Sequence, residues 1–323
     1  MHIAFDALLL LAGFVLLVQS AKIFVGASVD IARRLRIPPL VIGLTVVAMG
    51  TSAPEVVISV SAALGGSSDL ALANVIGSNI FNLMFIVGFC VLLFPIAVNM
   101  KLISRDYWVS VAATILLLVM IALFGDVIPR FGGLILLLGF VLYMIVVVKK
   151  ALRDKAAQEE TGQEEAASGA EQRDAPPKPL LRSILIALAG AALIVLGGQL
   201  TVSSAVDIAL KIGITERVVG LTIVAMGTSL PELITTLIAC RRGEGEFALG
   251  FIIGSSIFNI MFVLGLAGAI LPLAIDGSVL YDMIVLTAGT LIFYILARSG
   301  SRLVRLEGFA MAAVYVSYMV SIL

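Results

Sequence analysis

Long runs of apolar residues, separated by short polar or charged stretches, make up most of this chain. A helix that crosses the hydrocarbon core of a bilayer needs about 20 mostly apolar residues. Segments of this kind are found at 4–24, 38–63, 70–94, 106–124, 131–148, 183–204, 217–240, 247–271, 279–297 and 306–323. The pattern therefore predicts an all-α membrane protein with ten transmembrane helices.

One polar stretch interrupts this series between the fifth and the sixth predicted helix. Residues 149–182 are charged, rich in Ala, Glu and Gln, and contain prolines near their end, so they lack the apolar content to form a core of their own. We expect a flexible cytoplasmic linker between a first five-helix repeat, 1–148, and a second one, 183–323. A regulatory loop that senses calcium or a partner is the alternative, although the acidic residues do not have EF-hand spacing.

Lys and Arg are distributed unevenly among the predicted loops. With the N-terminus outside, eighteen of the 21 Lys and Arg fall on the inner side, and Arg130, Lys211 and Arg217 remain outside. Cytoplasmic loops of membrane proteins carry such an excess of positive charge. We therefore expect a multi-pass protein of the plasma (inner) membrane, with both termini outside and the linker in the cytoplasm.

The composition agrees with lipid as the main surroundings of the chain. Hydrophobic residues make up 61% and charged residues 13% of the sequence, whereas soluble proteins are about half apolar and a quarter charged. The formal net charge of zero gives no indication of a nucleic-acid partner. His2 is the only histidine, and Cys90 and Cys240 lie at apolar stretches, where small buried side chains are expected. We expect no resident cofactor and no obligatory protein partner.

The sequence overlays itself when it is shifted by 177 residues. Ile37–Glu55 lies on Ile214–Glu232, Asn74–Phe85 lies on Phe251–Phe262, and the alignment from residue 37 to 99 contains 28 identities in 63 positions. Each copy contains five predicted helices, an odd number, so the second copy enters the membrane in the opposite sense. Inverted repeats are typical of secondary transporters whose binding site lies at the bilayer midplane.

The strongest motif in both copies is A-M-G-T-S-x-P-E, at Ala48–Glu55 and Ala225–Glu232. Pro54 and Pro231 interrupt the helical hydrogen bonds and free backbone carbonyl groups in the middle of a span. Each motif ends in a glutamate at membrane depth, which costs several kcal/mol unless a cation or a proton compensates the charge. A protonated carboxyl group bonded to a neighbour is the purely structural alternative.

A second motif, G-S-x-I-F-N, occurs at Gly77–Asn82 and Gly254–Asn259. Its Ser and Asn are four residues apart and share one helix face. Alone, these side chains would be explained equally well by hydrogen bonds between helices. Together with the glutamates and broken backbone they form a set of hard oxygen donors, which Ca²⁺ prefers in a shell of six to eight ligands. Two carboxylates neutralise one Ca²⁺, and without it they need Na⁺ or H⁺, which favours exchange.

The paired motifs resemble the two signature repeats of the cation/calcium exchanger superfamily, in its sodium/calcium exchanger branch of prokaryotic type. The resemblance covers nearly the whole chain. It implies that helices 2, 3, 7 and 8 enclose the ion sites and that helices 1 and 6 slide across this core. It also implies a secondary active antiporter that exchanges Na⁺ for Ca²⁺ by alternating access in an electrogenic cycle.

The resemblance further implies which residues bind each ion. Calcium would be bound by Glu55, Glu232, Thr51 and Thr228. Sodium would add Ala48, Ser52, Ser78, Ala225, Ser229 and Ser255 to these, and Asn82 and Asn259 would line a central site that could hold water. In the potassium-dependent branch an Asp at the position of Asn259 is linked to K⁺ transport, so Asn259 implies independence of K⁺.

Two other transport functions stay open at this point. An H⁺/Ca²⁺ (cation/proton) antiporter would also compensate buried carboxylates, but such relatives usually carry a G-N-x-x-E sequence, and no mid-span His or further Asp offers a proton relay. A cation channel would need a continuous polar pathway, whereas one inverted-repeat site suits occlusion. An enzyme is not expected, since no nucleophile–base pair, phosphate loop or cofactor motif is present.

Overall fold

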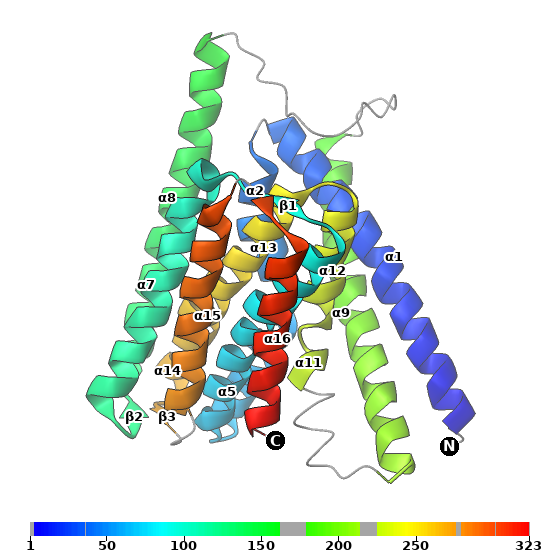
Figure 1. Cartoon of the computed structure of the whole chain (residues 1–323), viewed down its shortest axis with the longest axis vertical. Coiled ribbons are helices and arrows are strands. Elements are labelled where there is room, and N and C mark those ends of the chain that lie inside the picture. The colour runs from blue at the N-terminus through cyan, green and yellow to red at the C-terminus, as the bar shows by residue number, and fades with distance from the viewer. Residues whose placement is uncertain are drawn as a thin grey trace.

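Almost the whole described part of the chain is helical, and the long helices run roughly along the long axis of the molecule (Figure 1). The computed structural model describes residues 3–35, 37–161, 179–213, 225–275, 279–300 and 302–322. Seven of its helices are long and apolar enough to cross a membrane, or eight if one bent pair counts as a single span. The prediction of a helical membrane protein is therefore confirmed.

Six long helices lie around a core of shorter ones. The long helices are α1 (Ile3–Leu35), α7 (Met100–Phe124), α8 (Arg130–Thr161), α9 (Leu180–Lys211), α15 (Val279–Ser299) and α16 (Arg305–Ile322). The core helices of the first half are α2 (Pro39–Ile42), η1 (Gly43–Val47), α3 (Ala48–Thr51), α4 (Ala53–Leu64), α5 (Ser68–Ile80), η2 (Phe81–Ile86) and α6 (Val87–Leu93). Those of the second half are α11 (Ala225–Gly227), α12 (Leu230–Arg241), α13 (Gly245–Ile257), η4 (Phe258–Val263) and α14 (Leu264–Ile270).

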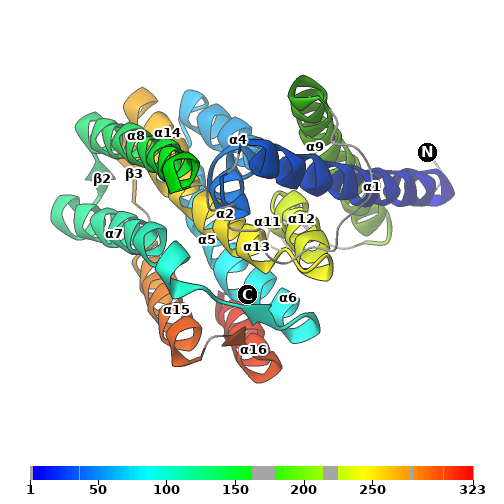
Figure 2. The ribbon, with the colours of Figure 1, turned by 90° about the horizontal axis from the view of Figure 1, so that it is seen from above.

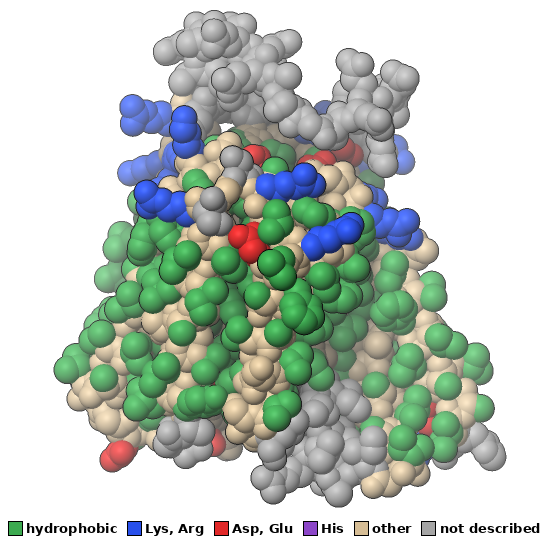
Figure 3. All heavy atoms as spheres, in the orientation of Figure 1, with side chains coloured by type: hydrophobic (Ala, Val, Ile, Leu, Met, Phe, Trp, Pro, Cys, Tyr) green, Lys and Arg blue, Asp and Glu red, His purple; other side chains and the backbone are tan. Residues whose placement is uncertain are grey.

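Burial separates the core from the periphery. The most apolar parts of Ser68–Leu93 and Gly245–Ile270 are 78% and 94% buried, whereas those of α1, α7, α8, α9 and α15 are at most 44% buried. Both core helices carry the G-S-x-I-F-N motif. Apolar side chains cover the middle of the molecule, as expected of a surface that faces lipid (Figure 3).

Two of the ten predicted spans are not among these candidate membrane helices. The predicted span 217–240 begins in residues 214–224, which lie outside the described part, and continues as α11 and α12. The helix α16 is present but carries Arg305 and Glu307 in its first turn, which lowers its apolar character. The count of ten therefore stays a prediction.

The helix α8 reaches further than its apolar segment. The sequence predicts the end of this helix near residue 148, but α8 continues to Thr161. Residues 149–161 are rich in Ala, Lys, Glu and Gln, which are strong helix formers, so the beginning of the predicted linker falls inside this helix. Residues 162–178 of the predicted linker lie outside the described residues, and α9 begins at Leu180.

The chain is broken at a serine in both copies of the A-M-G-T-S-x-P-E motif. Ser52 has φ −80° and ψ 14°, and the two helical pieces around it are bent by 49°. Ser229 has nearly the same conformation, with φ −91° and ψ 10°. Pro54 and Pro231 each follow in the first turn of the next helix, where a missing N–H is tolerated. Each break therefore ends one helix with free carbonyl groups and starts another with free N–H groups.

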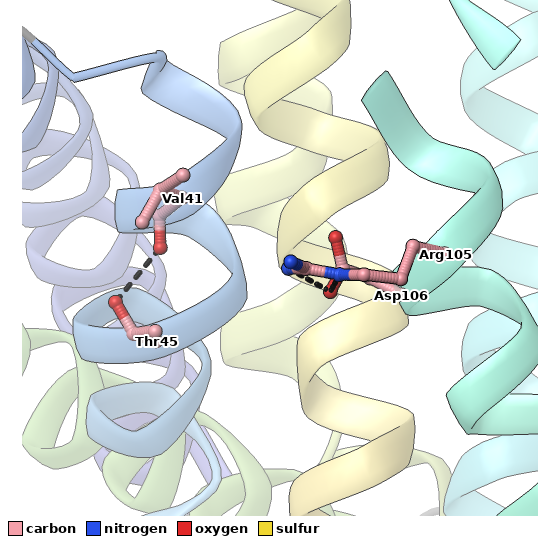
Figure 4. Close-up of polar contacts among 4 residues, drawn as sticks. All are labelled: Val41, Thr45, Arg105 and Asp106. Atoms are coloured by element: carbon pink, nitrogen blue, oxygen red, sulfur yellow. Dashed lines mark hydrogen bonds and ion pairs between the residues drawn. The ribbon is translucent and has the colours of Figure 1, made fainter. Parts of the chain in front are cut away.

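Among the described residues, three segments of π-helix lie in the core, and the apolar pattern does not predict them. The segments η2 and η4 begin at Phe81 and Phe258, so Asn82 and Asn259 of the second motif lie in the wide turns. In η1, Thr45 Oγ1 donates to the carbonyl oxygen of Val41 at 2.8 Å (Figure 4). Extra π-turns in helices occur often at functional sites.

The two halves of the chain interlock through short antiparallel strand pairs. The strand β1 (Ile96–Ala97) of the first half pairs with β4 (Arg302–Leu303) of the second. In the same way, β2 (Val127–Ile128) pairs with β3 (Leu273–Ala274). The strands β1 and β3 occupy corresponding positions in the two copies of the repeat, each just after a proline. Two strands of the first half are therefore hydrogen-bonded to two strands of the second half.

Aromatic contacts repeat this exchange between the halves. Tyr315 on α16 lies 5.2 Å from Phe81 and 5.3 Å from Phe85 of η2, between ring centroids. Phe140 on α8 lies 5.6 Å from Phe258 and 5.3 Å from Phe262 of η4. The last helix of each half thus packs on the π-helical segment of the other half.

The helices α1 and α9 form a pair on one flank of the molecule (Figure 2). A Cβ atom on Gly197 would lie 2.7 Å from the backbone N of Leu17, and one on Gly13 would lie 2.8 Å from the backbone N of Thr201. Small residues allow such close approach between membrane helices. Asp6 of α1 is buried and forms an ion pair with Lys211 of α9. We expect the pair to move as one unit.

The two ends of the molecule differ in charge. Lys and Arg side chains gather at the end where α8 ends (Figure 3), here called the basic end, while the N- and C-termini both lie at the opposite end (Figure 1). Near the basic end, Arg105 pairs with the buried Asp106 at 2.7 Å (Figure 4). Arg33 of α1 pairs with Glu244, the residue before α13, at 3.5 Å.

Candidate cation-binding site

The two glutamates of the repeated motif lie in the first turn of a helix. Glu55 belongs to α4 and Glu232 to α12, each directly after a broken segment. Both side chains are fully buried, with 0% exposure. The N-terminus of a helix carries a partial positive charge and free N–H groups, which favour a nearby carboxylate. The broken backbone thus explains how two acidic side chains are held inside an apolar core.

The two glutamates are brought together by serines from the opposite halves. Ser52 Oγ donates to Glu232 Oε1 at 3.1 Å, and Ser229 Oγ donates to Glu55 Oε1 at 3.3 Å. Each donor is the residue at the helix break. Ser52 lies three residues before Glu55 and Ser229 three residues before Glu232, so these reciprocal bonds bring the two carboxylates close together. Both halves therefore contribute one glutamate and one serine to a single pocket.

The second motif extends this pocket on the side of Glu232. Ser255 Oγ shares a hydrogen bond of 2.9 Å with Ser52 Oγ and accepts one of 3.3 Å from Asn82 Nδ2. A continuous chain of hydrogen bonds therefore runs from Asn82 through the two serines to Glu232. The close approach of α13 is permitted by Gly254, since a Cβ atom there would lie 2.4 Å from the carbonyl oxygen of Leu44.

Several buried oxygen atoms of the motif residues have no hydrogen-bond partner among the residues that the structure describes. They are Glu55 Oε2, Glu232 Oε2, Ser78 Oγ, Asn82 Oδ1, Thr228 Oγ1 and Asn259 Oδ1. A buried polar atom without a partner costs about 1–3 kcal/mol, and native proteins keep few of them. Carboxylate, amide and hydroxyl oxygens are the ligands that Ca²⁺ and other hard cations prefer. This oxygen set fits a cation.

The remaining predicted ligands occupy the broken segments. Thr51 Oγ1 donates to the carbonyl oxygens of Val47 and Ala48, at 3.1 and 3.4 Å, so its hydroxyl is used within its own helix. The carbonyl oxygen of Ala48 also accepts from the backbone N–H of Ser52 at 3.1 Å. Ala225 begins α11, and its side chain lies outside the described residues. Ser78 is close to Glu55 but makes no well-formed hydrogen bond with a described residue.

Asn79 is a residue of this region that the sequence analysis missed. It is fully buried and lies between the two residues of the second motif that were singled out. Its Oδ1 accepts a hydrogen bond of 3.2 Å from Asn259 Nδ2. Its amide side chain is a sequence signal, but Ser256 stands at this position in the second copy, so the repeat does not mark it.

A helical membrane protein with two broken core helices and an oxygen-lined pocket between its halves has the features of a secondary cation transporter. The family described as sodium/calcium exchanger protein matches residues 5–149 and 182–323 of the chain. The chain belongs to the sodium/calcium exchanger family, whose members are transporters.

Individual relatives agree with this assignment over most of the chain. The chain is 32% identical over 348 residues to the sodium/calcium exchanger MaX1 of Methanosarcina acetivorans, covering 98% of both. It is 36% identical over 275 residues to the inner membrane protein YrbG of Escherichia coli (strain K12), covering 83% of this chain and 81% of YrbG. The solved structure of the sodium-calcium exchanger NCX_Mj, soaked with zero Na⁺ and Ca²⁺, matches with a TM-score of 0.84 at 28% identity, covering 100% of both chains.

Proposed function

We propose that this protein is a secondary active antiporter that exchanges Na⁺ for Ca²⁺ across the membrane by alternating access. The observation that carries this proposal is the pair of buried glutamates, one from each half, surrounded by oxygen atoms without a described partner. Two adjoining buried carboxylates repel each other and lose their hydration. An ionised pocket without cations is therefore costly, and a cation must be exchanged for another before the pocket changes sides.

The proposed ligands combine the buried side-chain oxygens of the pocket with carbonyl groups at the helix breaks. Ca²⁺ binds between Glu55 and Glu232, with the carbonyl oxygens of Thr51 and Thr228 at the broken helix ends. Na⁺ uses two flanking positions, one near Ala48, Ser52 and Ser255 and one near Ser78, Ala225 and Ser229. Asn82 and Asn259 line the centre. The C-terminal end of a helix carries partial negative charge, which favours a cation at these carbonyl groups.

We also propose the finer architecture. Ten spans are arranged as two inverted repeats, residues 1–148 and 183–323, joined by the linker 149–182. The reciprocal strand pairs and aromatic contacts between the halves support this arrangement. The basic end is cytoplasmic, because positive charge is enriched there, so both termini lie outside. The likeness to the inner membrane protein YrbG supports a place in the inner membrane.

The proposed cycle is electrogenic and independent of K⁺. Asn259 contributes a neutral amide to the centre of the pocket, so no further monovalent cation is needed to balance a third carboxylate. A secondary transporter of this kind has no enzymatic step, and Na⁺ and Ca²⁺ are its substrates.

The test is Ca²⁺ flux into proteoliposomes that contain the purified protein. We expect an imposed Na⁺ gradient to drive Ca²⁺ against its own gradient, with a rate that changes with the clamped membrane potential. Replacing K⁺ by choline should leave the rate unchanged. Flux driven equally well by a pH gradient in the absence of Na⁺ would establish the proton antiporter instead. Downhill Ca²⁺ flux without any counter-ion would indicate a channel.

A further inference from the structure

The third position of the G-S-x-I-F-N motif is the place where the two halves of the pocket differ. Asn79 stands there in the first copy and Ser256 in the second. Both side chains are buried. Ser256 Oγ donates to the carbonyl oxygen of Ile252 in its own helix, at 3.0 Å, so it is satisfied locally. Asn79 instead reaches into the other half.

Asn79 makes two hydrogen bonds across the boundary between the halves. Its Nδ2 donates to the backbone oxygen of Ser256 at 3.3 Å, and its Oδ1 accepts from Asn259 Nδ2 at 3.2 Å. An asparagine amide has a single acceptor oxygen and a donor NH₂ group. Because the donor end of Asn259 is directed to Asn79, the acceptor end, Oδ1, is left without a partner among the described residues and is available to a cation.

The corresponding asparagine of the first half is bound differently. Asn82 Nδ2 donates to Ser255 Oγ at 3.3 Å. If the two halves were equivalent, Asn259 would donate in the same way to Ser78, the serine that corresponds to Ser255. The Asn259 amide is directed to Asn79 instead. Ser78 Oγ has no partner in the described part of the chain, whereas Ser255 Oγ is engaged by two hydrogen bonds.

We propose that Asn79 is a positioning residue that turns the Asn259 amide away from Ser78 and thereby makes the two Na⁺ positions of the pocket unequal. The Ser78 side keeps a free hydroxyl oxygen next to Glu55, which can bind Na⁺ directly. On the opposite side, Ser255 Oγ already accepts a hydrogen bond from Asn82, so only part of its acceptor capacity is left for an ion. Na⁺ therefore binds more tightly on the Ser78 side. This inference rests on the proposed exchange of Na⁺ for Ca²⁺.

The direct test replaces Asn79 by the residue of the other half, Asn79→Ser. We expect the Na⁺ concentration for half-maximal Ca²⁺ transport to rise about three-fold, the change that corresponds to one hydrogen bond of about 0.6 kcal/mol between membrane helices. The Ca²⁺ concentration for half-maximal rate should change by less, because both glutamates are retained. Asn79→Leu keeps the branched side-chain shape and removes both hydrogen bonds, and it serves the same test if Asn79→Ser is not recovered folded.

A matched control lies on the same helix. Asn74 Nδ2 donates to Ser59 Oγ of α4 at 3.0 Å, outside the pocket. Asn74→Ser therefore removes a comparable hydrogen bond between helices, and both ion dependences should stay at the wild-type values. The double variant Asn79→Ser with Ser256→Asn moves the amide to the other half, where it can accept from Asn82 and release Ser255. We expect this exchange to restore the Na⁺ dependence towards wild type.

Equal shifts for Na⁺ and Ca²⁺ in Asn79→Ser, accompanied by a lower midpoint of thermal unfolding, would show a purely structural role and overturn the assignment. An unchanged Na⁺ dependence, or a double variant with no recovery, would overturn it as well. The wild type separates these failures from a failure of the proposed function, because wild-type protein without Na⁺-driven Ca²⁺ transport would refute both.

Discussion

Each half of the chain supplies the pocket with a glutamate, a serine at a helix break and a Ser–Asn pair, but the two sets are held differently. On the side of Glu232, the side chains of Asn82, Ser255 and Ser52 form one chain of hydrogen bonds that ends on the carboxylate. That side is a connected network. Its hydroxyl groups are already bonded before any ion binds.

The side of Glu55 is less connected. Ser229 donates to the carboxylate, but Asn259 bonds to Asn79 and leaves Ser78 without a partner among described residues. The two ligand sets are similar in sequence, but Asn79 in one half and Ser256 in the other are bonded differently. The comparison teaches that equivalent positions in a repeat do not imply equal strength of ion binding.

A second difference between the halves lies at the start of the second core helix. Glu244 precedes α13 and pairs with Arg33 of α1, whereas the corresponding position before α5 is Ser67. The buried side chains of α1 also concentrate in the part of the helix that leads to the basic end. The ion pair with Glu244 therefore attaches α1 to the core at the basic end, and Ser67 cannot provide such a pair in the other copy.

The largest expected effect comes from removing either acidic side chain. Glu55→Gln and Glu232→Gln should each abolish Ca²⁺ transport. Removing one partner of a buried charge pair, here a carboxylate that faces Ca²⁺, costs about 3–5 kcal/mol. That loss corresponds to at least about 100-fold in Ca²⁺ affinity. Ca²⁺ uptake by proteoliposomes measures this. Asp69→Asn, an exposed acid at the start of α5, is the control that should transport normally. Transport by either glutamine variant at the wild-type rate would contradict the shared pocket.

Asn259→Asp should alter the choice of ions. A third carboxylate 4 Å from a cation attracts it by about 4 kcal/mol at an effective dielectric constant of 20, so we expect monovalent cations to bind at least ten-fold more tightly. K⁺ should then stimulate Ca²⁺ transport, which the wild type should not show. Transport assays with K⁺ replaced by choline provide the measurement. The same K⁺ and Na⁺ profile in both proteins would mean that Asn259 does not face the ions.

The network on the Glu232 side can be compared directly with the unbonded serine on the other side. Ser255→Ala removes two hydrogen bonds and should lower the free energy of unfolding by about 1 kcal/mol. Ser78→Ala removes an unpartnered buried hydroxyl, so stability should stay the same or rise, while the Na⁺ requirement increases. Thermal unfolding and Na⁺-dependent transport of the two purified variants decide the matter. Equal loss of stability in both would argue against the difference between the sides.

The smallest effect is expected at the basic end. Glu244→Gln removes the partly exposed ion pair between Arg33 of α1 and Glu244 before α13, worth about 0.2–1 kcal/mol. The pocket should then open more easily towards the basic end. The Ca²⁺ concentration for half-maximal binding from that end should fall by about two-fold or less. Burial raises the pKa of Glu244, although Arg33 and Arg242 oppose this, so acidification should break the pair at a higher pH than for an exposed carboxyl group. Glu246→Gln, outside the ion pair, is the control. An effect of equal size in both variants would refute the specific role of Glu244.

The sequence was sufficient to predict the features that depend on local pattern. Apolar runs predicted the helices, and the repeated glycine, proline and glutamate placed Glu55 and Glu232 at helix breaks, where the structure has them. The serine of each first motif donates to the glutamate of the other copy, and the ion ligands themselves stay a prediction. Cys90 and Cys240 are buried and free, as their apolar surroundings indicated. These features follow from the chemistry of short segments.

Features that depend on distant contacts could not be predicted in this way. The ion pair between Asp6 and Lys211 joins residues about 200 positions apart, and neither is marked by a motif. The π-helical turns η2 and η4 could not be predicted, because their residues are as apolar as those of an ordinary buried helix. Asn79 could not be predicted from the repeat, because the corresponding residue of the second copy is Ser256. Its role becomes visible only through its contacts with Asn259 and Ser256.

The central claim is that the two glutamates form a single pocket in which Ca²⁺ and Na⁺ replace one another. Equilibrium binding of Ca²⁺ to the purified protein in lipid nanodiscs, titrated with Na⁺, tests it most directly. We predict one Ca²⁺ bound per chain, displaced by Na⁺ with a dependence steeper than first order and not displaced by K⁺. Two independent Ca²⁺ ions per chain, or Ca²⁺ binding that Na⁺ does not affect, would contradict the account.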